Sequence, residues 1–277
     1  MITTTDLTKS YKNKDVLTGV TFHLEQGGIH GLLGRNGVGK STLLGILAGQ
    51  IKADGGTAEV MGYAPFDNAE LMDEVVLAGV DTPYPAAWSA QAILQAAALR
   101  YPRWDEQGAN RLAGDFALEG MLDTKYSALS RGQKAMLGII VGLASGAPLT
   151  LLDEPYVGLD THNRRVFYQH LLEMSNSGRT FIMATHHIHE SAKVLDSFIV
   201  LGRDGKVARH VDVADVADEY VLASAPDLDE VPGALAFRRS PELDRALIPR
   251  ADAANLPGAR LENADLDDII DAMLEES

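Results

Sequence analysis

Short apolar segments separated by polar, glycine-containing connections recur along the chain. The segments Gly28–Leu33, Leu149–Leu152 and Thr180–Ala184 each have the length of one buried strand. Apolar helices are predicted beside them, one over Leu43–Ala48, ending near Gly49, and one over about Lys134–Ala144. Wholly apolar strands interleaved with helices are typical of an α/β fold with a mostly parallel central sheet.

Two further sets of elements are predicted around this alternation. The segments Leu17–Leu24 and Thr57–Met61 predict edge strands of a small antiparallel sheet. After Ser89 the pattern becomes helical, with an alanine-rich helix over Ala90–Leu99 and a second helix over Asp105–Phe116. The central sheet is therefore expected to carry an antiparallel edge and a separate group of helices.

The C-terminal region has folding signals of its own. Tyr220–Ala223 and Ala234–Phe237 predict short strands. An amphipathic helix follows, because its apolar residues recur at helical spacing: Leu266, Ile269, Ile270, Met273 and Leu274. Residues 211–277 are therefore expected to form a folded α+β appendage, which we interpret first as an ordinary packing extension.

One stretch resembles a membrane span in length. Residues 135–152 carry no charge for 18 residues and contain Gly138 and Gly142 at the spacing found in packed membrane helices. Ser145–Pro148 interrupts this stretch, because glycine and proline break both helices and strands. We interpret it as one buried helix followed by one buried strand.

Composition and charge narrow the function classes. The 277 residues are 46% hydrophobic and include no cysteine, which excludes disulfides and thiolate chemistry. The net charge of −15 is concentrated in residues 211–277, which hold 17 acidic residues and 5 arginines. No basic stripe of the kind that binds nucleic acid is visible, so no nucleic-acid partner is expected. The first residues lack the apolar core of a secretory signal.

A phosphate-binding pattern, G-x-x-x-x-G-K-[ST], follows the strand at Gly28–Leu33 and precedes the helix at Leu43–Ala48. Glycines allow the backbone N–H groups to surround phosphate oxygens, and the helix N-terminus adds further donors. Lys40 is expected to reach the β- and γ-phosphates, Ser41 to bind Mg²⁺, and Thr42 to donate to a phosphate. The pattern therefore predicts a bound nucleoside triphosphate, held by Gly34, Arg35, Asn36, Gly37, Val38, Gly39, Lys40, Ser41 and Thr42.

Two carboxylates stand at the end of the strand Leu149–Leu152. Asp153 is the expected Mg²⁺ partner, and Glu154 is placed to orient and polarise the attacking water. Pro155 follows directly, so a strand end meeting a turn is the alternative interpretation. Because the phosphate-binding pattern is present in the same chain, we favour the interpretation of Asp153 and Glu154 as functional residues.

The segment Leu129–Gln133, with the sequence LSRGQ, identifies a subclass. With it the chain resembles the ATP-binding cassette (ABC) family, whose signature is LSGGQ. The resemblance implies that Ser130, Gly132 and Gln133 contact the γ-phosphate of ATP held by a second subunit. Arg131 departs from the usual glycine; its side chain either points away or adds a positive charge near the triphosphate.

Further segments extend the resemblance over almost the first 210 residues. Gly158–Asp160 is similar to the family's D-loop, and His186, at the end of an apolar strand, matches the switch histidine that contacts the γ-phosphate. His187 and His189 are interpreted as helix-start residues rather than metal ligands. Tyr11 corresponds to the aromatic residue that stacks on adenine; packing of Tyr11 within its own sheet is the alternative.

One element of the family pattern is altered. A glutamine that binds Mg²⁺ and couples hydrolysis to the membrane partner is expected after a strand, and Asp81 stands at that position after Val75–Gly79. An aspartate there can still approach the metal, but it adds a negative charge. Gln91 and Gln95 are alternatives that fit poorly, because they fall in the predicted helix Ala90–Leu99.

The resemblance implies a P-loop NTPase fold and a division of labour. Residues 1–210 would form the nucleotide-binding domain, with a helical subdomain at about 82–135, and residues 211–277 the appendage. The function implied is ATP hydrolysis by the motor subunit of a transporter, resembling bacterial exporters. ATP and Mg²⁺ are the expected cofactors.

The expected partners are a second ATP-binding subunit and a transmembrane permease subunit, with the chain cytoplasmic and peripheral on the inner face of the membrane. The alternative is a cassette ATPase without a membrane partner that acts as a nucleotide-dependent switch.

Overall fold

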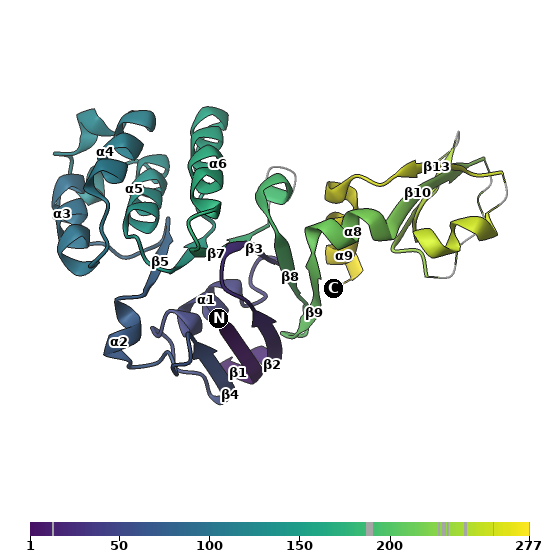
Figure 1. The fold of residues 1–277 in the computed structure, drawn as a ribbon, viewed down its shortest axis with the longest axis horizontal. Helices are drawn as coiled ribbons and strands as arrows, with labels where there is room; N and C mark the ends of the chain where they lie inside the picture. Colours follow the sequence, from purple (N-terminus) through teal and green to yellow (C-terminus); the bar gives the residue numbers. More distant parts are fainter. Residues whose placement is uncertain are drawn as a thin grey trace.

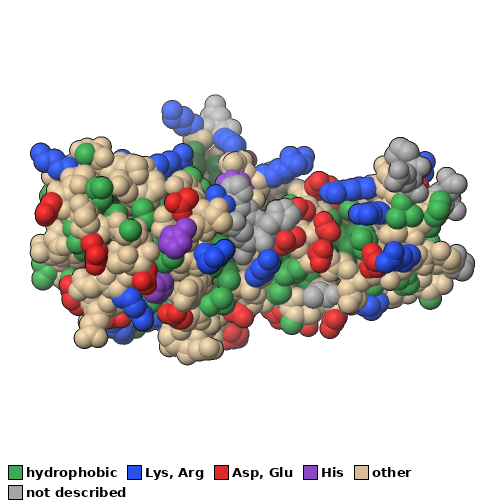
Figure 2. Space-filling model, turned by 90° about the horizontal axis from the view of Figure 1, so that it is seen from above, with side chains coloured by type: hydrophobic (Ala, Val, Ile, Leu, Met, Phe, Trp, Pro, Cys, Tyr) green, Lys and Arg blue, Asp and Glu red, His purple; other side chains and the backbone are tan. Residues whose placement is uncertain are grey.

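The computed structural model describes residues 1–277 except 13, 187–190, 227, 229–230, 232, 241–242, 257 and 277. The described elements form an elongated molecule, with a group of helices at one end, the appendage at the other and the central sheet between them (Figure 1). Acidic and basic side chains are interspersed along the face shown in Figure 2.

The central sheet confirms the prediction of a mostly parallel α/β fold. Its strand order is β5-β6-β7-β3-β8-β9, and only the pairing of β8 with β9 is antiparallel. The strands are β3 (Gly28–Leu33), β5 (Val75–Gly79), β6 (Leu149–Asp153), β7 (Thr180–Thr185), β8 (Ser197–Leu201) and β9 (Val207–Asp212). Because neighbouring parallel strands end at one edge, the residues after β3, β5, β6 and β7 are brought together there.

The uncharged stretch is a helix and a strand, as predicted. Helix α5 (Arg131–Ala144) is buried from Ala135 onward and leads through the break into β6. Its glycines let it approach the sheet closely, because a Cβ on Gly138 would lie 3.2 Å from the carbonyl oxygen of Gly79. Among the described residues no helix is long and apolar enough to cross a membrane.

The helices at one end of the molecule begin at side-chain caps. Ser89 caps α3 (Ala90–Arg100) and Asp105 caps α4 (Glu106–Asp115), close to the predicted bounds. They pack with α5, while α6 (Thr161–Ser175) follows the end of β6. Shorter helical segments before residue 200 are α2 (Ala69–Met72), η1 (Glu119–Met121), η2 (Tyr126–Ala128) and η3 (Ala192–Val194).

The antiparallel edge consists of β2 (Lys14–Leu24), β1 (Ile2–Tyr11) and β4 (Gly55–Val60), in that order. The sequence predicted the two outer strands, and β1 lies between them. This sheet encloses helix α1 (Lys40–Leu47) against the central sheet through a shared apolar cluster. The end of β1 therefore comes close to the loop between β3 and α1.

The C-terminal region folds as an antiparallel sheet with helices, as predicted. Its strand order is β11-β12-β10-β13. The elements are α8 (Val213–Glu219), β10 (Tyr220–Ala225), β11 (Ala236–Arg238), β12 (Asp244–Pro249), η4 (Arg250–Asn255), β13 (Arg260–Asn263) and α9 (Leu266–Glu276). The apolar face of α9 belongs to the same buried cluster as the central sheet, through residues such as Ile269 and Met273.

Candidate functional site

The loop between β3 and α1 forms the floor of the candidate site. Gly34, Gly37 and Gly39 have φ angles of 153°, 78° and 120°, which favour glycine. Gly39 also lacks space for a side chain, since a Cβ there would lie 2.8 Å from Leu17 Cδ2. Val38 N donates to Arg35 O over 3.3 Å and closes the turn. The loop thus places the N-terminus of α1 at the edge of the central sheet.

Lys40 is almost fully buried at the start of α1. Its Nζ donates to Gly34 O over 2.7 Å and to Arg35 O over 3.4 Å, and it lies 3.5 Å from Glu154 Oε1. Burial lowers the pKa of Lys40, and the neighbouring carboxylates of Glu154 and Asp153 oppose that shift. The ammonium group is therefore held inside the loop, next to the end of β6.

Asp153 is the last residue of β6 and faces the loop. Its Oδ1 is buried without a hydrogen-bond partner among the described residues. Burial raises the pKa of Asp153, while the hydroxyl of Ser41 lowers it by a hydrogen bond. A buried, unpaired carboxylate oxygen beside a hydroxyl offers the hard oxygen ligands that Mg²⁺ prefers. These residues therefore fit a magnesium ion.

Glu154 has an uncommon backbone conformation for a residue other than glycine, with a φ of 47°. Its amide N donates to Ala184 O of β7 over 3.0 Å. Its carboxylate accepts from the Tyr156 hydroxyl at 3.4 Å and lies 2.9 Å from His186 Nδ1. The strained backbone and these contacts direct the carboxylate toward Lys40.

Two adjoining cavities contain most of the predicted site residues. The larger, about 790 Å³ including space open to solvent, is lined by Tyr11, Val16, Asn36, Gly37, Gly39, Lys40, Ser41, Thr42 and Glu154. The smaller, about 620 Å³, is lined by residues that include Ser41, Gln50, Asp81, Asp153 and Glu154. Val16 and Gln50, which line these cavities, and Tyr156, which contacts Glu154, were not predicted as site residues, because none belongs to a recognised motif. Arg35 is exposed on the loop.

Tyr11 stands at the end of β1, with 44% of its surface exposed, and faces the larger cavity. Lys9 Nζ lies 5.4 Å from the centroid of its ring. An exposed aromatic ring beside the phosphate-binding loop offers a flat apolar surface for a base.

The predicted signature residues lie at the start of α5 and line neither of these cavities. Ser130 and Gln133 form a capping box, in which Ser130 Oγ accepts from Gln133 N over 3.2 Å and Gln133 Oε1 accepts from Ser130 N over 2.8 Å. Gly132 packs against the D-loop, since a Cβ there would lie 2.6 Å from Gly158 O. Asp160 caps α6 through Asn163 N at 2.8 Å.

The two departures from the family pattern meet in one place. Asp81 and Arg131 line a single hollow together with Tyr126 and Lys134. Asp81 follows β5 in a turn, where Thr82 Oγ1 accepts from Gly79 N over 3.0 Å. Asp81 therefore faces the cavity of Asp153 on one side and two basic residues on the other.

The alternative glutamines, Gln91 and Gln95, lie on α3 and line neither cavity beside the phosphate-binding loop. Gln50, which follows α1, is the glutamine that does line the smaller cavity. The interpretation of His187 and His189 as helix-start residues falls outside the described residues.

The chain is similar in sequence to known proteins. Residues 17–157 match the family model described as "ABC transporter". The chain is 28% identical over 258 residues to the ABC transporter ATP-binding protein YtrB of Bacillus subtilis, covering 91% of this chain and 88% of that protein. It is 30% identical over 264 residues to the Nod factor export ATP-binding protein I of Rhizobium etli, and the match covers 92% of this chain and 80% of that protein.

A solved structure shares the fold. It is the dimeric, post-hydrolysis structure of the ATP-binding cassette MJ0796 bound to ADP and Pi. The TM-score is 0.65 at 23% identity, and the match covers 77% of this chain and 99% of that one. The match therefore extends over nearly the whole chain of the solved structure.

Proposed function

The chain belongs to the ABC transporter family, and we propose how its residues share the work of binding and hydrolysing ATP. It is an ATP-binding subunit, an ATPase that serves as the motor of a transporter, and it dimerises and works with a membrane partner. The roles of individual residues, the magnesium ion and the surfaces that meet each partner are the proposal.

ATP binding rests on the β3–α1 loop. The backbone N–H groups of the loop and the start of α1 hold the phosphates, and Lys40 moves from its contact with Gly34 O to the β- and γ-phosphates. Arg35, Asn36 and Val38 form the loop's outer turn, and Thr42 adds a donor from the first helical turn. Tyr11 stacks on the adenine, with Val16 as the neighbouring apolar wall.

Ser41 and Asp153 would hold a magnesium ion, and Asp81 lines the same cavity. The buried Oδ1 of Asp153, which has no hydrogen-bond partner among the described residues, supports this assignment. When bound, the ion neutralises charge on the β- and γ-phosphate oxygens. Asp81 adds a second carboxylate where the family has a neutral amide.

Hydrolysis depends on Glu154, which orients a water molecule and accepts its proton as the water attacks the γ-phosphorus. His186, 2.9 Å from this carboxylate, positions it and donates to the γ-phosphate. The observation that carries the proposal is the meeting of Lys40, Glu154 and His186 at the edge where β3, β6 and β7 end.

The second half of each site comes from a partner subunit. Ser130, Gly132 and Gln133 do not line their own chain's nucleotide cavity. We assign them to the ATP of a second copy or a paralogue, with the N-terminus of α5 facing the γ-phosphate. The D-loop, which packs against Gly132, transmits changes between the two sites.

The helical end docks the membrane subunit. Trp88 and Leu99 expose 45% and 92% of their surfaces there, and exposed apolar side chains of this size favour a protein contact. Residues 82–135 would form the docking subdomain within a cassette of residues 1–210. The chain would then lie in the cytoplasm on the inner face of the membrane, attached through that partner, with no nucleic acid involved.

The test is a pair of substitutions in the purified protein. Lys40→Ala should lower ATP turnover by roughly 100-fold or more, because a buried phosphate donor is lost. Glu154→Gln should abolish turnover yet leave ATP binding intact, so that ATP alone gives a stable dimer in sedimentation velocity. Lys14→Ala, at an exposed position of β2, is the control. Unchanged turnover in both variants would overturn the assignment.

A further inference from the structure

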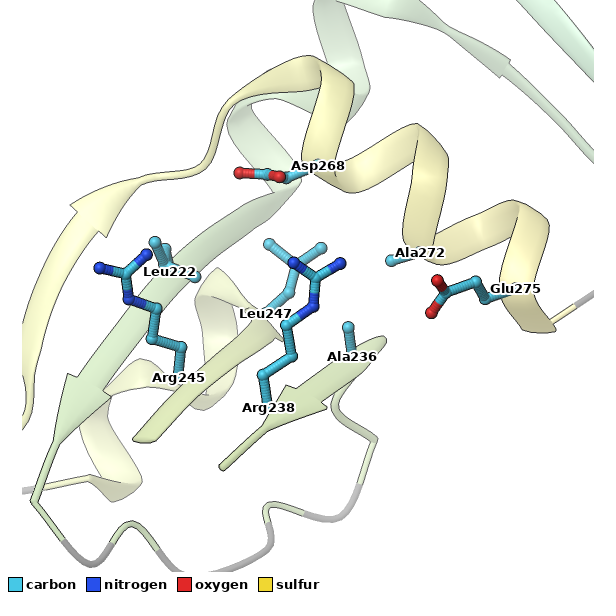
Figure 3. A pocket seen from close by; sticks show the side chains of 8 residues that line it. All are labelled: Leu222, Ala236, Arg238, Arg245, Leu247, Asp268, Ala272 and Glu275. Carbon is cyan, nitrogen blue, oxygen red and sulfur yellow. The ribbon is translucent and has the colours of Figure 1, made fainter. Parts of the chain in front are cut away.

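The appendage contains a pocket between its sheet and helix α9 (Figure 3). The pocket encloses about 500 Å³, including space open to solvent. Its apolar surface comes from Leu222 of β10, Ala236 of β11 and Leu247 of β12, with Ala272 of α9 facing them. These side chains form an apolar floor beneath an opening to solvent.

Two arginines rise from this sheet toward α9 (Figure 3). Arg238 of β11 and Arg245 of β12 are direct cross-strand partners in the antiparallel register. Like charges in directly opposite positions destabilise a sheet, so this pairing is unfavourable unless an anion compensates it. Among the described residues neither guanidinium lies within ion-pair distance of a carboxylate.

The other arginines of the appendage have different surroundings. Arg250 donates to Asp218 O over 2.7 Å, and Arg260 pairs with Glu262 at 2.6 Å. The guanidinium of Arg239 lies 5.6 Å from the ring centroid of Phe237. Among the described residues, Arg239, Arg250 and Arg260 therefore each contact another group of the chain. Arg238 and Arg245 show no side-chain hydrogen bond, ion pair or ring contact within that part of the chain, and both line the pocket.

The opposite wall carries the opposite charge. Asp268 and Glu275 of α9 face the pocket near its two ends (Figure 3). Both are exposed, and neither is within ion-pair distance of Arg238 or Arg245. A purely anionic ligand would meet repulsion from this wall, and a purely cationic one would meet repulsion from the arginines.

We propose that this pocket binds a small zwitterionic molecule whose anionic and cationic groups are joined by an apolar body. The anionic group binds Arg238 and Arg245, whose planar guanidinium groups suit a carboxylate or phosphate. The cationic group binds Asp268 and Glu275. The apolar body covers Leu222 and Leu247, which are the centre of the floor.

The pocket is separate from the nucleotide site. No residue of the β3–α1 loop lines it, and the appendage lies at the end of the molecule opposite the helices α3 and α4 (Figure 1). A ligand here would act as a signal to the motor or strengthen the appendage. Helix α9 connects the pocket wall to the apolar cluster that continues into the cassette, through Ile269 and Met273.

The binding test uses three probes of matched length on the full chain: 6-aminohexanoate, hexanoate and hexylammonium, each by isothermal titration calorimetry. We expect saturable binding of 6-aminohexanoate, about 10-fold tighter than either singly charged probe, because it alone pairs with both walls. Equal affinity for all three probes, or no saturable binding of 6-aminohexanoate, would overturn the proposal.

Substitutions locate the binding. Arg238→Gln with Arg245→Gln should weaken 6-aminohexanoate about 10-fold, and Asp268→Asn with Glu275→Gln should weaken it similarly. Arg239→Gln is the matched control and should leave its affinity unchanged. Basal ATP turnover should be unaltered in all three variants, which shows that they fold. Binding that persists in both double variants would contradict the assignment.

Discussion

Helices α1 and α5 of this chain both begin at a proposed phosphate contact, but their N-termini are built differently. Helix α1 starts at the buried Lys40, beside the carboxylates of Asp153 and Glu154. Helix α5 starts beside the exposed Ser130, whose side chain and backbone are closed by a capping box with Gln133. The first start is enclosed beside two carboxylates, while the second is open and is capped by neutral side chains.

The difference between these two helix N-termini explains why one chain supplies only half of each proposed ATP site. Buried charges such as Asp153 are unfavourable in the free protein and become favourable only with a bound ligand. The α5 start is stabilised without a ligand, because Ser130 Oγ already accepts a hydrogen bond from Gln133 N. It offers a ready surface to a phosphate that is held on another molecule.

The largest expected effect comes from a negative charge added at the N-terminus of α5. Ser130→Asp should retain the helix cap, since aspartate caps as well as serine does. It should nevertheless lower ATP turnover by about 100-fold or more, because a carboxylate would face the partner's γ-phosphate. The control Ser130→Asn keeps the cap without the charge, and should retain most of the activity. Similar turnover in the two variants would place this helix away from ATP.

The contact between the signature and the D-loop gives the next effect. Gly132→Ala should destabilise the protein by about 1–3 kcal/mol, since its Cβ would lie 2.6 Å from the backbone oxygen of Gly158. Gly120→Ala is the control, because a Cβ there meets nothing within 4 Å. Urea unfolding measures both. If Gly132→Ala and Gly120→Ala had equal free energies of unfolding, the segments around Gly132 and Gly158 would separate at no cost.

The two helix starts should respond with opposite signs when a polar group is removed. Ser130→Ala should lower the free energy of unfolding by about 1 kcal/mol through loss of the cap. Asp153→Asn should raise it by about 1 kcal/mol in the absence of nucleotide and metal, because a neutral amide replaces a largely buried carboxylate whose Oδ1 has no hydrogen-bond partner among the described residues. Thermal or urea unfolding measures both variants. If the free energy of unfolding changed with the same sign in both, the contrast between the starts of α1 and α5 would be wrong.

The smallest effect concerns Asp81 and Arg131. These residues line one hollow, so their charges should interact weakly across solvent. A double-mutant cycle with Asp81→Asn and Arg131→Gly should give a coupling of about 0.2–1 kcal/mol in the free energy of unfolding. Strict additivity would mean that the two departures from the family pattern are independent.

Local patterns predicted much of this structure. The β3–α1 loop, the break between α5 and β6, and the helices that begin after Ser89 and near Asp105 all rest on residues close together in sequence. The sequence missed features that depend on distant segments. The positive φ of Glu154, the approach of Gly132 to Gly158, and the like-charge pair Arg238–Arg245 arise only when the strands and helices pack.

The most direct test of a site shared between subunits is an ATP-dependent cross-link, which the absence of cysteine makes clean. Asn36→Cys, on the loop before α1, and Arg131→Cys, at the start of α5, are introduced into separate Glu154→Gln chains, mixed, and treated with a short bismaleimide. If the site is shared between subunits, a covalent dimer forms in the mixture when ATP and Mg²⁺ are present, and none forms without nucleotide. No cross-link with ATP, or an internal cross-link in a monomer that carries both cysteines, would contradict it.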